Sequence, residues 1–130
     1  MEKLESFPPE QSEKACNSSL NAIGDSLYAI GGKWKLRLIV VLLHGNRRFN
    51  DLQRTIKGIS SKVLASELKD LELNGFVKRN VLTESPLVIE YELTEYALTL
   101  RKVLEALNEW GTAHREKIRQ GMKEEFEASR

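Results

Sequence analysis

The chain has 130 residues, of which 41% are hydrophobic and 30% charged, and its formal net charge is +1. This length suits one compact domain. No apolar run reaches the ~18 residues that cross a membrane, and the charged N-terminus lacks the apolar segment of a signal peptide, so we expect a cytoplasmic protein. The single cysteine excludes an intrachain disulfide and a thiolate metal cage.

Positive charge is concentrated in the middle of the chain. Between Lys33 and Arg79 the sequence holds eleven basic and four acidic residues, a net charge of +7, whereas the remainder carries −6. A basic segment flanked by acidic ends is typical of a protein that binds a polyanion. A solvated lysine-rich surface has the same composition, so charge alone leaves both interpretations open.

The N-terminal part of the sequence predicts an arm followed by one amphipathic helix. Residues 1–14 contain Pro8-Pro9 and many charges, which favours a flexible N-terminal arm. Helix-starting Asn and Ser residues then open a helix over residues 17–30. Its apolar stripe consists of Leu20, Ile23, Leu27 and Ile30.

The stretch Gly31-Gly32-Lys33-Trp34 raises the question of a phosphate-binding loop. Such a loop needs an eight-residue pattern after a strand, and here a helix precedes it, so we interpret the two glycines as a helix end. A second, largely apolar helix follows at 33–43. Lys33 and Lys35 lie in its first turn, where free N–H groups attract anions such as a DNA phosphate. Trp34 is expected to pack in the core.

Two further helices are predicted on either side of a tight turn. Residues 47–49 form a brief extended piece, and Asn50 or Asp51 is expected to cap a short helix with Leu52 and Ile56 on one face. Arg54 is expected to pair with Asp51. Residues 57–59 make the turn.

The fourth predicted helix starts at Ser60 or Ser61 and runs to about residue 73. Asn74-Gly75 is a clear C-terminal signal. The core stripe of this helix is Leu64, Leu68 and Leu71.

A β-hairpin and a long helix complete the chain. Residues 76–82 and 88–93 are strand-like, with residues 83–86 as the loop between them. Thr94 is expected to cap a last helix covering about residues 95–122. Its apolar residues lie on or near one stripe: Leu100, Leu104, Leu107, Trp110 and Ile118.

This order predicts a mainly α fold with a small β-hairpin wing, that is, a winged helix-turn-helix. The free face of the helix after the turn is small and polar, which suits a helix that enters the DNA major groove. Candidate base and phosphate contacts on this recognition helix are Ser60, Ser61, Lys62, Ala65, Ser66 and Lys69. Candidate phosphate and wing contacts are Lys33, Lys35, Arg47, Arg48, Lys57, Lys78 and Arg79.

The sequence resembles the HxlR-type winged helix-turn-helix transcriptional regulators over residues 16–115. The matching motifs are "IGGKW" at 30–34, "RRFNDL" at 47–52, "GIS" at 58–60, "LASELKDLELNGFVKR" at 64–79, "EYELTE" at 90–95 and "NEWG" at 108–111. Their order and spacing together are specific. The chain departs from the family pattern at Asn17 after the cysteine, at Val88 in the wing and at Ala97.

The resemblance implies a homodimer that binds an inverted-repeat operator in double-stranded DNA. It implies one domain at 15–125, with a DNA-binding core at about 33–93 and dimerisation helices at about 17–30 and 95–122. The expected interface residues are Leu20, Ile23, Leu27, Leu104, Leu107 and Trp110. Cys16 occupies a position where many members carry a cysteine and some sense oxidants or electrophiles. A cysteine packed as a small hydrophobic residue is the other interpretation.

No enzymatic constellation is visible in the sequence. His44 and His114 are isolated, no ligand spacing joins them to Cys16, and no nucleophile–base arrangement can be identified. We therefore expect no catalysis, no metal and no cofactor, and the sequence names no small-molecule or oxidant effector. The alternative function is a winged-helix module that binds another protein and no DNA.

Overall fold

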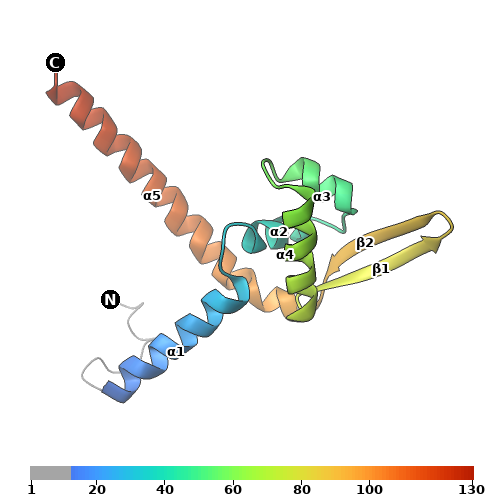
Figure 1. The fold of residues 1–130 in the computed structure, drawn as a ribbon. Coiled ribbons are helices and arrows are strands. Elements are labelled where there is room, and N and C mark those ends of the chain that lie inside the picture. The colour runs from blue at the N-terminus through green and yellow to red at the C-terminus, as the bar shows by residue number, and fades with distance from the viewer. Residues whose placement is uncertain (1–12) are drawn as a thin grey trace.

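A computed structural model describes residues 13–130 and consists of helices with one β-hairpin (Figure 1). The elements in chain order are α1 (Glu13–Ile30), α2 (Lys35–Leu43), α3 (Phe49–Thr55), α4 (Ser61–Leu73), β1 (Val77–Glu84), β2 (Leu87–Leu93), the 3₁₀ helix η2 (Tyr96–Leu100) and α5 (Arg101–Ala128). The predicted mainly α fold with a hairpin wing is confirmed. The predicted arm lies outside the described residues apart from Glu13 and Lys14, which begin α1.

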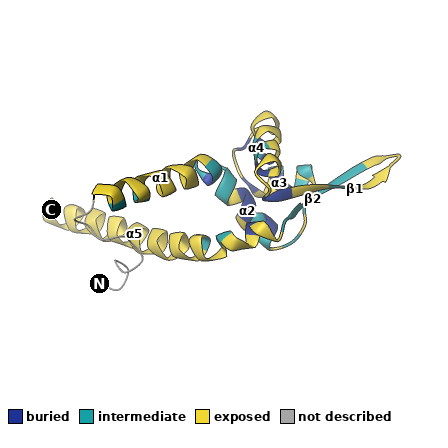
Figure 2. Ribbon diagram, turned by 90° about the horizontal axis from the view of Figure 1, so that it is seen from below, coloured by how far each residue is buried: buried dark blue, intermediate teal, exposed yellow. Residues whose placement is uncertain are grey.

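The hydrophobic core lies where α2, α3, α4 and the base of the hairpin meet. In Figure 2 the buried residues gather in this central region, and α1 and α5 extend from it as largely exposed helices. The predicted stripe of Leu64, Leu68 and Leu71 on α4 is fully or almost fully buried, and so are Leu52 and Ile56. They pack with the apolar side of α2, formed by Leu38, Ile39 and Leu42.

The paired glycines end α1, as the sequence predicts. The N–H of Gly31 donates to the carbonyl oxygen of Leu27 at 2.7 Å. A Cβ atom on Gly31 would collide with that same oxygen, and Gly32 has a φ of 92°, so both positions favour glycine. Helix α2 begins at Lys35, slightly later than predicted, and Trp34 packs against the core from its N-cap position.

The start of α3 differs from the prediction. The N-cap position is held by Arg48 without a side-chain hydrogen bond, so Asn50 or Asp51 as the cap is wrong. The chain enters α3 from a bridge to the hairpin, in which the backbone groups of Arg47 and Tyr91 exchange hydrogen bonds of 3.1 and 2.7 Å. This long-range pairing fixes where the helix can begin, which local residue preferences cannot indicate.

Helix α4 has the caps that the sequence predicts. The Ser60 hydroxyl oxygen accepts a hydrogen bond from the N–H of Val63 at 3.1 Å. At the other end Asn74 is the C-cap, and Gly75 follows with a φ of 81°.

The hairpin is longer than predicted and the last helix is divided. Strands β1 and β2 pair antiparallel through Glu84 and Leu87, so the connecting turn is shorter than the expected loop at 83–86. The Thr94 hydroxyl accepts a hydrogen bond from the N–H of Ala97 at 3.2 Å, next to the start of η2, whose N-cap residue is Glu95. The long helix α5 starts only at Arg101, which corrects the prediction that Thr94 caps it.

Helices α1 and α5 expose most of their apolar side chains. Ile30 is the buried residue of α1, and α5 has none. Among the residues predicted to form a dimer interface, Leu20, Leu27 and Trp110 are more than 60% exposed in the single chain. Within residues 13–130 no helix combines the length and the apolar character needed to cross a membrane.

Candidate nucleic-acid interface

Helix α4 presents a small, polar face to solvent. The opposite side of the helix carries its buried residues, Leu64, Leu68 and Leu71, which pack against the core. All six predicted recognition-helix residues are exposed: Ser60, Ser61, Lys62, Ala65, Ser66 and Lys69. Lys62, Ala65, Ser66 and Lys69 follow helical three- and four-residue spacing, so they share one face. Their side chains are short or flexible, which leaves room for a second surface to approach the helix backbone.

The turn between α3 and α4 gives the pair its helix-turn-helix geometry. Gly58 has a φ of 90°, which a residue with a side chain rarely adopts. Lys57 beside it is exposed, and so is Arg48 at the start of α3. Basic side chains therefore flank the exposed face of α4 in the helix-turn-helix unit.

The hairpin projects away from the core as a wing (Figure 1). Its sequence places charged residues near its base and apolar residues toward its tip. Near the base, the Lys78 ammonium lies 3.4 Å from a carboxylate oxygen of Glu92, and Arg79 is exposed. Near the tip, Leu82 and Leu87 are exposed, at 49% and 63%. The wing thus offers a phosphate little positive charge beyond its base.

Glu92 is held in its ionised form at the base of the wing. Its pKa lies below the ordinary glutamate value, chiefly because the Asn80 side-chain amide donates a 2.9 Å hydrogen bond to the carboxylate. The neighbouring Lys78 lowers the pKa further, and desolvation by burial opposes both effects. This carboxylate partly neutralises Lys78, so Arg79 is the freer cation of the two.

Lys35 has different partners from the phosphate that the sequence suggested. Its ammonium lies 3.2 Å from a carboxylate oxygen of Glu67 and 3.5 Å from one of Asp70, and its side chain is only 13% exposed. Both carboxylates belong to α4, so these ion pairs join the first turn of α2 to α4. We therefore assign Lys35 to the positioning of α4. Its separation from Glu67 by 32 residues explains why local patterns missed the pair.

The remaining predicted cations are divided between free and partly engaged groups. Lys33 is exposed, with its ammonium 4.7 Å from the centre of the Trp34 ring. Arg47 is half-buried, and its guanidinium donates to the carbonyl oxygen of Asn46 at 3.2 Å. The predicted pairing of Arg54 with Asp51 is confirmed.

Cys16 lies in the first turns of α1 and is exposed. The part of the chain from residue 13 onward contains no group of three or more His, Cys, Asp or Glu side chains arranged to hold a metal ion.

The helix-turn-helix, the hairpin behind it and the flanking long helices define a winged helix-turn-helix protein. Residues 29–119 match the model of the HxlR-like helix-turn-helix family, and the chain belongs to this family. The resemblance seen in the sequence is thereby confirmed.

The chain is similar to transcriptional regulators over most of its length. It is 38% identical over 102 residues to YtcD of Bacillus subtilis, an HTH-type transcriptional regulator. This alignment covers 78% of the present chain and 79% of YtcD. Among solved structures it resembles the redox regulator HypR in its reduced form, with a TM-score of 0.71, 34% identity and coverage of 76% of this chain and 98% of HypR. The reduced form of the B. subtilis regulator YodB gives a TM-score of 0.62 and 37% identity, covering 68% and 87% of the two chains. The protein is a transcriptional regulator of the helix-turn-helix type.

Loss of the Lys35 ammonium should destabilise the protein, because Glu67 and Asp70 would remain close together without their shared cation. We expect Lys35→Met to lower the free energy of unfolding by about 1–2 kcal/mol, measured by urea denaturation. The matched control is Arg54→Met, which removes an exposed pair and should cost no more than ~0.5 kcal/mol. Equal effects of the two substitutions would contradict a structural role for Lys35.

Proposed function

We propose that this protein binds DNA sequence-specifically by placing α4 in the major groove. The exposed polar face of α4, opposite its leucine stripe, is the observation that carries this proposal. A helix that reads the major groove needs small or flexible side chains on its exposed face, and these side chains must be able to hydrogen-bond to base edges. Membership of the HxlR-like family supports the same conclusion.

The exposed residues divide between base contact and phosphate contact. Lys62, Ser66 and Lys69, in the middle of the exposed face, are assigned to base edges, and Ser60 and Ser61 at the start of α4 to the adjacent backbone. Ala65 is assigned to close apolar contact, which suits the methyl group of thymine. The cations around α4 are assigned to phosphates: Lys33, Arg48, Lys57, Lys78 and Arg79.

DNA binding should be strongly salt-dependent, with each neutralised phosphate adding about −0.9 to the slope of log K against log salt. Lys57→Ala should weaken all duplexes alike. Lys62→Ala and Ser66→Ala should change sequence preference, by about 1–3 kcal/mol at one base pair. The measurements are selection of duplexes from a random pool and gel shifts at several salt concentrations.

Two outcomes of these experiments would contradict the assignment. If all three substitutions weaken binding to every duplex by the same factor, α4 is not the element that recognises the base sequence. A wild-type protein without salt-sensitive binding to any duplex would favour the alternative function, a winged-helix module that contacts another protein.

We further infer that the regulator acts as a homodimer through α1 and α5. Five of the six residues assigned to the interface are exposed apolar residues of these helices: Leu20, Ile23, Leu27, Leu107 and Trp110. The sixth, Leu104, is half-buried. Leu104 alone among them packs partly against the core of its own chain. Apolar stripes of this extent are normally covered by a partner, and a two-fold axis would place the same patch on both subunits. Two copies of α4 about 34 Å apart would read an inverted repeat.

Leu107→Glu should shift the protein from dimer to monomer, because a carboxylate would be buried without a partner in the interface. Sedimentation equilibrium at micromolar concentration measures the change. The matched control is Val81→Glu on the wing, since Val81 and Leu107 are both 48% exposed. A wild-type monomer, or dimer loss with both variants, would contradict the assigned interface.

We propose that Cys16 makes this regulator responsive to oxidants. Its exposed thiol lies at the start of a proposed dimer helix, and the similar protein HypR is a redox regulator. The thiolate would attack hydrogen peroxide to give a sulfenic acid with release of hydroxide, and a small thiol would then form a mixed disulfide with release of water. Because Cys16 lies in a proposed dimer helix, this modification would change the relative orientation of the two subunits. The spacing of their two α4 helices would change with it.

Oxidation should change the affinity for the selected duplex in the wild type but not in Cys16→Ser. The measurement is a gel shift with reduced and peroxide-treated protein, with mass spectrometry to identify the adduct on Cys16. The DNA affinity of reduced Cys16→Ser should match that of the reduced wild type. An oxidative change that persists in Cys16→Ser would place the responsive group elsewhere.

A further inference from the structure

Polar side chains form a row across the base of the wing. Tyr91 of β2 is paired with Arg79 of β1 on one side and with Arg47, just before α3, on the other. Directly opposed residues of antiparallel strands point to the same face of a sheet, so these side chains share one face, with Tyr91 in the middle. Both backbone hydrogen-bonding groups of Tyr91 are used by Arg47, at 3.1 and 2.7 Å. The pairing of Tyr91 with Arg79 is therefore of the non-hydrogen-bonded kind, in which side chains lie closer together.

The two faces of the wing base carry different charges. On the face opposite the Arg47–Tyr91–Arg79 row, Glu90 accepts a hydrogen bond from the Asn46 side chain at 3.1 Å. On that same face, Glu92 accepts one from Asn80 at 2.9 Å and lies beside Lys78. The face of the row carries no carboxylate between residues 77–81 and 89–93. The carboxylates of the wing base thus lie away from the row, which faces an approaching anion with cations and a hydroxyl.

The row has hydrogen-bonding capacity that the protein itself does not use. Arg79 is exposed and forms no ion pair with any of residues 13–130. Arg47 donates to the carbonyl oxygen of Asn46 at 3.2 Å, which leaves its other N–H donors free. The Tyr91 hydroxyl has no hydrogen-bond partner in the described part of the chain, where no sealed side-chain oxygen or nitrogen lacks one, so this hydroxyl reaches solvent. The Tyr91 ring packs against the core, a role that needs no hydroxyl.

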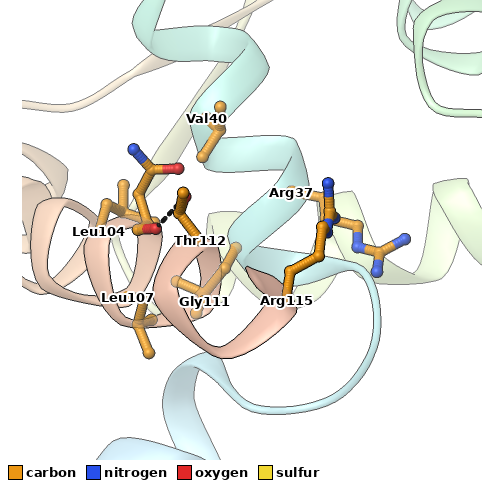
Figure 3. Close-up of a pocket in the computed structure, with 9 residues that line it drawn as sticks. Arg37, Val40, Leu104, Leu107, Gly111, Thr112 and Arg115 are labelled. Carbon is orange, nitrogen blue, oxygen red and sulfur yellow. Dashed lines mark hydrogen bonds between the residues drawn. The ribbon is translucent and has the colours of Figure 1, made fainter. Parts of the chain in front are cut away.

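The row lies outside the surface assigned to the dimer. That surface follows α1 and α5 and includes Leu104 and Leu107, which also line the hollow between α2 and α5 in Figure 3. The row belongs to neither helix, so an interface made of these helices does not include it. It is continuous instead with the proposed DNA interface, because Arg79 and Arg48, which follows Arg47 in the chain, are both assigned to phosphates.

We propose that the Arg47–Tyr91–Arg79 row holds one phosphate of the DNA backbone, with the Tyr91 hydroxyl as its central donor. The two arginines would donate charge-assisted hydrogen bonds from either side, and the phenol O–H would donate to the same group. Neighbouring strands lie ~4.8 Å apart, so the outer members of the row start about 10 Å apart, a span that two arginine side chains can close around a phosphate. This contact rests on the proposed function and adds a residue, Tyr91, that positions the wing on the duplex without reading a base.

Tyr91→Phe removes only the hydroxyl and tests its role. Affinity should fall about tenfold for the selected duplex and for a random duplex alike, because a hydrogen bond to a charged group is lost and no base contact changes. The slope of log K against log salt should stay the same, since no charge is removed. The urea midpoint should also stay the same, because the hydroxyl has no partner in the free protein. Gel shifts at several salt concentrations and urea denaturation provide these measurements.

A double-mutant cycle tests whether Tyr91 and Arg79 hold the same phosphate. Arg79→Gln should weaken all duplexes and reduce the size of the salt slope by about 0.9. In that background Tyr91→Phe should cost about threefold instead of about tenfold, because the two groups share one ligand. In the background of Lys57→Ala, whose phosphate is a different one, Tyr91→Phe should still cost about tenfold.

Uncharged methylphosphonates, introduced at one phosphate position at a time, locate the contact on the duplex. At the phosphate held by the row, the replacement should weaken the wild type more than it weakens Arg79→Gln or Tyr91→Phe. At every other position the three proteins should lose affinity by the same factor.

Three results would overturn the inference. The first is DNA affinity of Tyr91→Phe equal to that of the wild type, and the second is an equal effect of Tyr91→Phe in the Arg79→Gln and Lys57→Ala backgrounds. The third is a row that takes free phosphate instead of DNA, seen as NMR shifts at residues 47, 79 and 91 on addition of inorganic phosphate while Tyr91→Phe binds DNA normally. A wild type without salt-sensitive binding to any duplex contradicts the proposed function itself, whereas a wild type that binds and is matched by Tyr91→Phe contradicts only the role of the row.

Discussion

Burial of one side of α4 determines what the rest of the protein can do. Leu64, Leu68 and Leu71 face the core, and because they are the apolar residues with helical spacing, the helix has one favourable rotation about its axis. That rotation directs the polar residues outward. The ion pairs of Lys35 with Glu67 and Asp70 then hold the side of the same helix against α2. Position and rotation of α4 are thus fixed by interactions that lie outside its exposed face, so residues on that face can change without loss of these interactions.

Ion pairs determine which cations of the basic middle segment are free to contact another molecule. The basic middle segment has a net charge of +7 in sequence, yet Lys35 is neutralised by α4 and Lys78 lies beside an ionised Glu92. The exposed cations of this segment for which the structure shows no ion pair are Lys33, Arg37, Arg48, Lys57, Lys62, Lys69 and Arg79. Four of them, Arg48, Lys57, Lys62 and Lys69, belong to the helix-turn-helix. The wing is the exception, since its outer half is apolar and carries Glu84. We therefore expect specificity and affinity to depend on α4 and its turn more than on the wing.

Local patterns predicted those elements whose causes are local. The Ser60 cap, the Gly31-Gly32 helix end and the leucine stripe of α4 each depend on residues within one or two helical turns, and all were correct. The start of α3 was not, because a bridge to Tyr91 fixes it. The ion pairs of Lys35 were not predicted either, because its carboxylate partners lie 32 or more residues away. The recognition-helix residues and the interface residues stay predictions.

The length of α5 has a mechanical consequence. This helix runs for 28 residues from Arg101, and at 1.5 Å per residue it is about 42 Å long. Leu104, near its first turn, packs against the core, and no residue of α5 is buried. A stiff rod held at one end is a lever, so a tilt of ~5° at that end displaces the far end by about 4 Å. Movements too small to disturb the packing of the core are therefore converted into displacements of several ångströms at the far end of α5.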